Sequence, residues 1–501
     1  MINEVLQVTS FDKEHKISSD KISSPSIKGK PTPVDFDTFV PWICLEFQVP
    51  YNITVHRKHQ DEYSRHKRHS HKGSRKLEHP LHESTRKALA IKVFSKNTKP
   101  DDDDSIPVTA SYNSKGHLTE IAIVNSPYEI PRKLIIAFTL CLPFHNSLGR
   151  ITIIKDKINF AVIHEISKLL PHSNITQVFL ENCDSGAKYH LLLEHLSQLR
   201  NLTLRRLGID DDECKNIVDK LGVGKPASKT LLTLDLSSNK LTDEAAHAFG
   251  YMLRGNRCLL HLNLCNNKIS DIGADCILKS LTSFLVTDNE ILDKKRRRFE
   301  YLVKRIAFYK QYKNELILRQ TQKESNKGKK HIMPHKKGHL KKSKTEPSFS
   351  IMSNLTIDEL AEKMTLDNIG EFIDAFDEEN LVIVHDQKFS IGNLRLCSLN
   401  LSYNNLSYIT VRKIYEVLNY QIKVLPKKLH LNTGLMRILF EGNSTPRYCQ
   451  EYKDICLLLD KVISENVTLP DLSHSTPSLK GRRDSTPSVK RSGHGSAHAK
   501  K

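Results

Sequence analysis

Long apolar runs are missing from the 501-residue chain, and it contains a single tryptophan. No run reaches the 18 or more apolar residues that a transmembrane helix requires, so we expect no contact with a membrane. The start, MINEVLQVTSFDKEHK, has no apolar core behind basic residues, so we expect no secretory signal. The ten cysteines form no C-x-x-C pair, and we expect reduced thiols. These absences favour a cytoplasmic protein.

Catalytic motifs are missing as well. The sequence has no P-loop, no G-x-G-x-x-G, no G-x-S-x-G and no H-E-x-x-H. The run Asp101–Asp104 lacks the spacing and the final glutamate of an EF-hand loop. Five histidines lie in a strongly basic segment, which favours a solvated loop over a metal site. We therefore expect no enzyme, no cofactor, no metal and no small-molecule substrate. The five histidines are His56, His59, His66, His69 and His71.

The net charge of +19 is concentrated in three short segments. Residues 56–76, 321–344 and 470–501 carry net charges of +6, +8 and +5, which together equal the whole excess. The basic character therefore belongs to appendages of an otherwise neutral body. Any polyanion should attract such segments nonspecifically at low salt. Specific nucleic-acid recognition is disfavoured, because aromatic residues that stack on bases are nearly absent from them.

Two neighbouring segments repeat one pattern without gaps. Their starts, Leu231 and Leu259, lie 28 residues apart, and each follows L-x-x-L-x-L-x-x-N-x-L, the signature of the leucine-rich repeat. A third full copy starts at Leu396, and a copy with Ile438, Phe440 and Asn443 starts at Leu435. The signature positions of the three full copies are Leu231, Leu234, Leu236, Asn239, Leu241, Leu259, Leu262, Leu264, Asn267, Ile269, Leu396, Leu399, Leu401, Asn404 and Leu406.

The pattern predicts the local structure. The x-L-x-L core is typical of a short strand with alternate side chains pointing inward. The asparagine turns the chain and bonds free backbone groups inside the turn. Residues 243–254 and 271–281 have the spacing of amphipathic helices on the outer face, with polar residues suited to helix starts before them. We predict an α/β solenoid of short parallel strands and outer helices.

Weaker copies precede the two clear ones. The repeat starts fall at residues 118, 148, 175, 199, 231 and 259, with intervals of 24 to 32 residues. Loops absorb such differences in length in repeat proteins. Each early unit alone is a weak match, but their common register supports the interpretation that they are also repeats.

Two interpretations of residues 281–291 remain open. The segment fits a seventh repeat loosely. Alternatively Phe284 and Leu285 form a closing strand, and Thr287 to Glu290 form a capping box that starts a helix. We favour the second, with a long basic helix over residues 288–320. After a linker, a second capping box at Thr356–Glu359 starts another helix whose apolar residues continue to Phe376. The resumed repeats should dock on the first block, because two isolated repeats bury too little surface.

These features divide the chain into segments. The termini and the linker are expected to be disordered, because they are polar and charged. Residues 36–50 are apolar enough to pack as a cap, together with Ala88–Phe94. The predicted segments are 1–35 (disordered), 36–117 (cap region with the basic insert 56–76), 118–287 (repeats), 288–320 (long helix), 321–350 (linker), 351–384 (helix and short strand), 385–465 (resumed repeats) and 466–501 (disordered basic tail).

The repeats at 231–281, the long basic helix, the lysine-rich insertion and the repeats at 385–407 occur in a distinctive order. This order resembles a family of leucine-rich repeat proteins of the ribonuclease-inhibitor-like class found in animals with motile cilia. The resemblance covers residues 118–465 and implies a non-enzymatic component of the axoneme of cilia or sperm flagella. The expected partners are proteins, such as tubulin or axonemal subunits. A nuclear, nucleic-acid-associated repeat protein is the alternative.

Two groups of residues are candidates for function. Strand positions between the inward leucines should face outward and offer a protein-binding face, although an ordinary solvated face explains them equally well. Thr476 and Thr486 precede prolines in the tail and match the minimal site of proline-directed kinases. The candidate binding face consists of Thr233, Asp235, His261, Asn263, Ser398 and Asn400.

Overall fold

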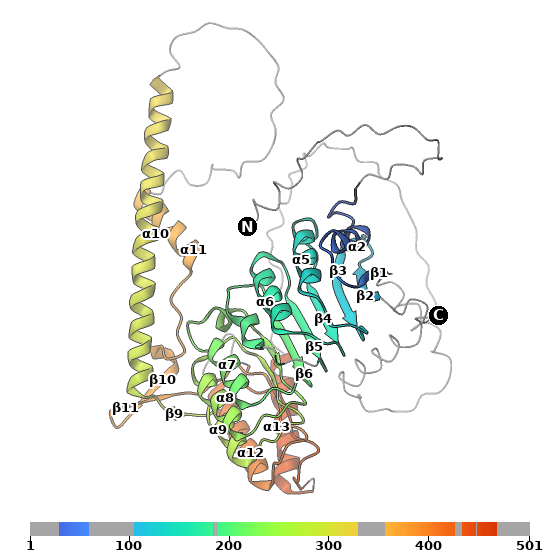
Figure 1. Ribbon diagram of the computed structural model, residues 1–501. Coiled ribbons are helices and arrows are strands. Elements are labelled where there is room, and N and C mark those ends of the chain that lie inside the picture. The colour runs from blue at the N-terminus through green and yellow to red at the C-terminus, as the bar shows by residue number, and fades with distance from the viewer. Residues whose placement is uncertain are drawn as a thin grey trace, which may run out of the picture.

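A single ten-stranded sheet runs through the protein (Figure 1). The computed structural model describes residues 30–59, 105–183, 186, 188–328, 356–425, 433–446 and 448–467. The strand order is β1-β2-β3-β4-β5-β6-β7-β8-β12-β13, and all neighbours pair in parallel except β2 and β3. The strands are β1 (Asn52–His59), β2 (Ser105–Tyr112), β3 (Leu118–Val124), β4 (Arg150–Ile154), β5 (Gln177–Glu181), β6 (Asn201–Arg205), β7 (Thr233–Asp235), β8 (His261–Asn263), β12 (Ser398–Asn400) and β13 (Arg437–Leu439).

Helices cover one face of this sheet (Figure 1). Each packs against the helices of the neighbouring units, as expected of a solenoid. The unit after β5 has only a 3₁₀ helix, η4 (Tyr189–Leu193), where its neighbours have α-helices. The α-helices are α2 (Phe36–Glu46), α5 (Arg132–Cys141), α6 (Phe160–Leu169), α7 (Asp211–Lys220), α8 (Asp243–Gly255), α9 (Asp271–Lys279), α12 (Tyr408–Val424) and α13 (Gln450–Val467), and the remaining 3₁₀ helices in this part are η2 (Leu142–Phe144), η3 (Leu170–His172) and η5 (Pro226–Lys229).

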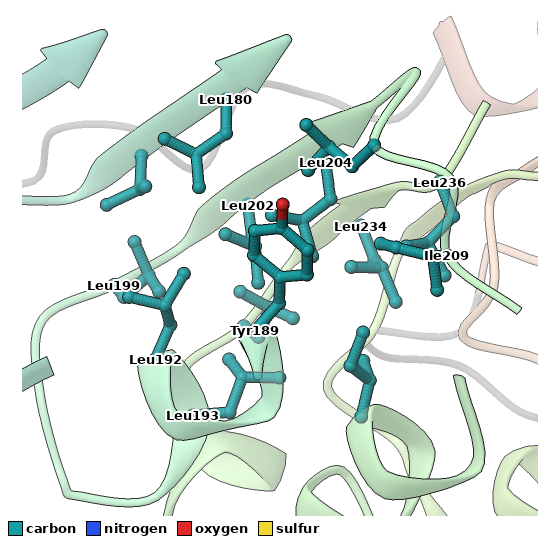
Figure 2. Packing of buried hydrophobic residues seen from close by; sticks show 14 of the residues in the cluster. Leu180, Tyr189, Leu192, Leu193, Leu199, Leu202, Leu204, Ile209, Leu234 and Leu236 are labelled. Atoms are coloured by element: carbon teal, nitrogen blue, oxygen red, sulfur yellow. The ribbon is translucent and has the colours of Figure 1, made fainter. Parts of the chain in front are cut away.

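The core lies between the sheet and the helices. Alternate strand residues enter it, so the signature leucines of the three clear repeats are almost completely buried. Figure 2 shows the middle units, where Leu180, Leu202, Leu204 and Leu234 surround the buried ring of Tyr189 from η4. Tyr189, Leu192 and Leu193 of η4 are all buried, so this short helix still contributes apolar side chains to the core.

The second repeat block continues the first directly. Leu399 of β12 is in register with Leu262 of β8, so the sheet closes over the insertion between them. The expected docking of the two blocks is therefore correct. The match of a parallel sheet and outer helices supports the predicted repeat solenoid.

The insertion between α9 and β12 forms its own small structure. Its three-stranded antiparallel sheet has the order β10-β11-β9, with β9 (Phe284–Leu285), β10 (Leu381–Val384) and β11 (Gln387–Ser390). The 3₁₀ helix η7 (Glu378–Asn380) directly precedes β10. The idea that Phe284 and Leu285 close the repeat sheet is thus wrong, because β9 pairs with β11. Phe284, Val286, Ala375 and Phe376 form a separate small core there.

The long helix α10 (Asp288–Gly328) projects from this insertion (Figure 1). It starts at the expected capping box, in which the amide of Glu290 donates to the Thr287 hydroxyl over 3.3 Å. It ends eight residues later than Gln320, so the linker does not begin at residue 321. Nothing before Gly328 breaks a helix, because residues 321–327 contain neither glycine nor proline. The side chain of Arg254 holds the base of α10 through Glu290 at 2.7 Å.

The second capping box also forms, at Thr356 and Glu359, and starts α11 (Ile357–Ile369) beside α10. The helix does not continue to Phe376 as expected. Gly370 follows it with φ of +68°, a left-handed conformation that glycine adopts readily and that ends the helix.

The N-terminal cap region is more ordered than the sequence suggests. Phe36 of α2 packs on Phe138 of α5, with ring centroids 5.8 Å apart. His56 and His59 do not belong to a loop, because they lie on β1, which is paired with β2 along its length. Residues 1–29, the insert from residue 60, Ala88–Phe94, Asp101–Asp104, 329–350 and the tail with Thr476 and Thr486 lie outside the described residues.

Gly392 lies where the end of the insertion packs closely against the backbone of Thr282, and a substitution there tests this contact. Its φ is +86°, and a Cβ atom would lie 2.4 Å from the backbone oxygen of Thr282. Gly392→Ala should lower the free energy of unfolding by about 2–4 kcal/mol in urea denaturation, through strain and overlap together. Gly116→Ala is the control, because its φ is +77° but its Cβ would meet open space. Equal losses from both variants would contradict the close approach at Gly392.

Candidate protein-binding surface

A ladder of asparagine side chains sets the geometry of the repeat turns. The carbonyl oxygen of Asn267 accepts bonds from the amides of Asn239 and Leu241, both at 3.2 Å. Its Nδ2 donates to the backbone oxygens of Leu236 and Leu264 at 3.2 and 3.0 Å. Each such asparagine therefore ties its own turn to the preceding one. Asn239, Asn404 and Asn443 form equivalent bonds.

Carboxylates form a second ladder at the helix starts. Asp243, the first residue of α8, accepts the backbone amide and the hydroxyl of Ser270, the residue that caps α9, at 2.7 and 2.5 Å. Asp211 accepts the same two bonds from Thr242, and Asp271 accepts them from Ser407. These bonds lower the pKa of Asp271, although its partial burial acts against them. The two ladders fix both ends of every unit in this region, so the strands between them are held in register.

The six candidate residues form two rows across the face of the sheet opposite the helices. Thr233, His261 and Ser398 are in register in one row, and Asp235, Asn263 and Asn400 in the next. The side chains of the second row already form hydrogen bonds within their own turns. Each of its side chains accepts the backbone amide two residues further on, at 2.9 to 3.1 Å. These three residues shape the strand ends, while the first row remains available for contacts.

The same rows continue over the earlier strands with larger side chains. Gln177 and Asn201 extend the first row, and Phe179 and Thr203 extend the second. Phe179 is half-buried on this face, and Arg150 of β4, next to Gln177, is exposed. Phe179 and Arg150 are not among the candidates that the sequence analysis identifies. The register of the weak repeats contains the signal, because Phe179 lies between the inward Val178 and Leu180.

Ion pairs orient the arginines of this face. Arg150 donates from Nε to Gln177 at 2.7 Å and lies 3.8 Å from the carboxylate of Glu120. Arg205 donates to the Ser237 hydroxyl at 3.0 Å and lies 3.7 Å from Glu181. Arginine and aromatic side chains held in this way are the residue types that contribute most to protein interfaces. The surface formed by Arg150, Gln177, Phe179, Arg205 and His261 is called the sheet face below.

His261 brings a neutral ring to the sheet face. Desolvation by its neighbours lowers the pKa of His261, and the positive charge of Arg437 lowers it further. The imidazole is therefore uncharged at neutral pH and can both donate and accept a hydrogen bond.

The described residues contain no group of three or more His, Cys, Asp or Glu side chains arranged to hold a metal ion. A polar hollow beside the N-terminal ends of the middle strands is lined by His145, His172 and Ser173, with no acid or cysteine among its lining residues. Its histidines therefore have no carboxylate in the lining to orient them, as the triad of a serine hydrolase requires. All ten cysteines are free. None of the helices in the described part of the chain is long and apolar enough to cross a membrane.

Asp156 occupies the ladder position of the β4 unit and is 3% exposed. Its Oδ1 accepts the amide of Ser126 at 2.5 Å, as an asparagine would, while its Oδ2 has no partner. Burial raises the pKa of Asp156 to about 7, against bonds from backbone amides that lower it. The folded protein thus binds a proton here that the unfolded chain releases near pH 4.

Asp156→Asn should therefore stabilise the protein at high pH. The wild type loses stability as pH rises from about 4 to 7, because the unfolded chain releases this proton while the folded protein still holds it, and its stability is level above 7. The variant lacks this loss and should gain about 2–4 kcal/mol in the free energy of unfolding at pH 8, and much less at pH 5. Urea denaturation at both pH values measures it. Asp212→Asn, on a side chain 92% exposed, is the control. An equal change for Asp156→Asn at both pH values would contradict the assignment.

Residues 227–250 and 255–278 each match the family model described as Leucine Rich repeat. These segments cover β7 with most of α8 and β8 with nearly all of α9, two of the units joined by the asparagine ladder. None of the curated proteins compared matches the sequence. The matched segments, the parallel sheet and the ladder together show that the chain contains leucine-rich repeats.

Proposed function

We propose that this protein is a non-enzymatic scaffold that binds another protein on the sheet face, and that it is a cytoplasmic component of the axoneme of motile cilia or sperm flagella. Leucine-rich repeats generally mediate contacts between proteins. The observation that carries the proposal for this chain is the sheet face itself. Phe179 and the oriented arginines Arg150 and Arg205 lie next to one another on strands held in register.

The chemistry of the sheet face favours a protein with a mixed polar surface as the partner. An aromatic ring supplies the apolar contact, and the arginines pair only loosely with Glu120 and Glu181, at 3.7 to 3.8 Å. Incoming carboxylates can therefore compete for them. Gln177, Asn201 and Thr233 add neutral donors and acceptors along the same row. Tubulin or another axonemal subunit is the proposed partner.

The ciliary part of the proposal rests on the resemblance in repeat order over residues 118–465. The interruption of one sheet by an insertion with a long basic helix is the feature that distinguishes this order. Repeats with an α-helix in most units and a spacing of 28 residues support the ribonuclease-inhibitor-like class.

Crosslinking with mass spectrometry on intact cilia or flagella tests this function with the full chain. Crosslinks from residues beside the sheet face, such as Lys155, to tubulin or another axonemal subunit are the expected result. Recovery of the protein with nuclear or ribonucleoprotein components, and its absence from axonemes, would contradict the proposal and favour the nucleic-acid alternative.

Substitutions on the sheet face test the surface directly. The double variant Arg150→Glu with Phe179→Ala should weaken binding of the crosslinked partner at least tenfold, because it removes an aromatic anchor and reverses a charge. Binding of the purified proteins by calorimetry measures this. Tyr251→Ala is the matched control, because Tyr251 is an exposed aromatic residue on α8, on the helical side. A loss for Tyr251→Ala as large as that for the double variant would place the interface elsewhere.

A further inference from the structure

The basic residues of α10 that face α11 are neutralised by acids. Residues 356–379 contain nine acids and one lysine, and they lie along one side of α10 (Figure 1). Arg297 contacts Asp374 at 2.7 Å, Lys313 contacts Asp358 at 2.6 Å, and Arg305 contacts Glu362. The packing also includes the rings of Tyr301 and Phe372, 5.5 Å apart. An acidic segment with apolar residues thus occupies this side of the helix.

The other side of α10 carries an apolar stripe that no residue described in the structure covers. Leu292, Phe299, Val303 and Ile306 are 64%, 68%, 51% and 54% exposed. At about 100° per residue they cluster roughly half a turn away from Arg297, Tyr301 and Arg305, which face α11. Soluble proteins rarely leave four large apolar side chains together on one exposed surface unless another molecule covers them.

Positive charges flank the stripe and have no acidic partner in the described part of the chain. Lys295 and Lys310 lie beside it on the helix, and neither makes an ion pair with any residue that the structure describes. Over residues 288–313 the helix carries nine basic and four acidic residues. The stripe therefore resembles the side of α10 that α11 covers, because both combine apolar side chains with basic residues. On the stripe side the lysines are not neutralised.

We propose that this stripe binds an acidic amphipathic helix of another protein. Leu292, Phe299 and Ile306 are spaced by seven residues, the repeat of a helix that packs along a second helix. Acidic residues beside the apolar seam of the partner would pair with Lys295 and Lys310, as Asp358 pairs with Lys313 further along α10. The stripe and the sheet face are on different elements, so this surface acts independently of the proposed function.

The charges distinguish this occupant from two others. A second copy of the chain would place the same excess of positive charge against α10, and like charges along paired helices are destabilising. An anionic membrane would also attract a basic amphipathic helix. The stripe spans only about 60° of the helix circumference, as narrow as the seam of paired helices, and this favours a helix over a flat lipid surface as the occupant.

The test uses the full chain and a synthetic 28-residue helix as the probe. The peptide has leucine at the two seam positions of each heptad and glutamate beside them, and its counterpart has lysine in place of glutamate. Fluorescence anisotropy should show the acidic peptide binding at least tenfold more tightly than the basic one, with weaker binding at 0.5 M salt than at 0.15 M.

Variants of α10 separate the stripe from the other basic segments of the chain. Phe299→Glu with Ile306→Glu should reduce binding of the acidic peptide at least tenfold, and Lys295→Glu with Lys310→Glu about fivefold. Lys304→Glu and Leu318→Glu are matched controls, because both residues are exposed on α10 away from the stripe, and both should bind as the wild type does. Circular dichroism verifies that the helices remain folded.

Three results would overturn the proposal. The first is binding of the acidic peptide that the stripe variants leave unchanged, since other basic segments would then explain it. The second is binding to vesicles of anionic phospholipid that requires Phe299 and Ile306, without tighter binding of the acidic peptide. The third is a dimer in analytical ultracentrifugation that Phe299→Glu dissociates, because a second copy would then cover the stripe.

Discussion

The repeat array depends on the pairing of asparagine amides with backbone groups inside each turn. A net hydrogen bond contributes about 1 kcal/mol, but a buried backbone group left without a partner costs about 1–3 kcal/mol. The ladder therefore stabilises the protein mainly because it pairs buried backbone groups that would otherwise be left without a hydrogen bond. It also spans the insertion, because Asn404 donates to the backbone oxygen of Leu264 at 3.0 Å and accepts the amide of Ile269 at 3.1 Å. These partners are more than 130 residues apart in the sequence, yet they are neighbours in the solenoid.

Because the ladder closes over the insertion, the inserted residues contribute nothing to the register of the sheet and are free to form a separate arm. The arm is nevertheless held firmly at its base. Arg254 of α8 pairs with Glu290, donates to the backbone oxygen of Leu285 at 2.8 Å and stacks over Phe284 at 4.0 Å. Partial burial acts to raise the pKa of Glu290, but its bonds from Arg254 and Thr287 together lower it. One arginine of the repeats thus fixes where α10 leaves the body, and the direction of the arm follows from the repeats.

Sequence pattern predicts the parts of this protein that repeat, and fails where a contact occurs once. Leu231 and Leu259 could be placed in the core because the same spacing recurs and each copy meets an equivalent neighbour. The pairing of β9 with β11 could not, because antiparallel pairing between Leu285 and Phe389 joins two segments without any shared motif. The end of α10 was missed because lysine-rich composition favours disorder and helix alike. Phe179 was missed because outward positions follow no rule of residue type.

The two ends of the sheet differ in what holds them together. In the early units the ladder position is occupied by Asp156, Cys183 and Leu207, and Cys183 offers only a weak thiol bond to Ile153, at 3.6 Å. These units contain the large side chains of the sheet face, Phe179 and Arg150 among them. The later units have the complete asparagine ladder, and their outward residues are small or already bonded to the turns. A partner seated on β4 to β6 would therefore contact the part of the sheet with the weakest turns, and its binding should stabilise those units more than the rest. The later units keep their register without a partner, because Asn239, Asn267 and Asn404 already satisfy the turns, and they can support the arm whether or not the sheet face is occupied.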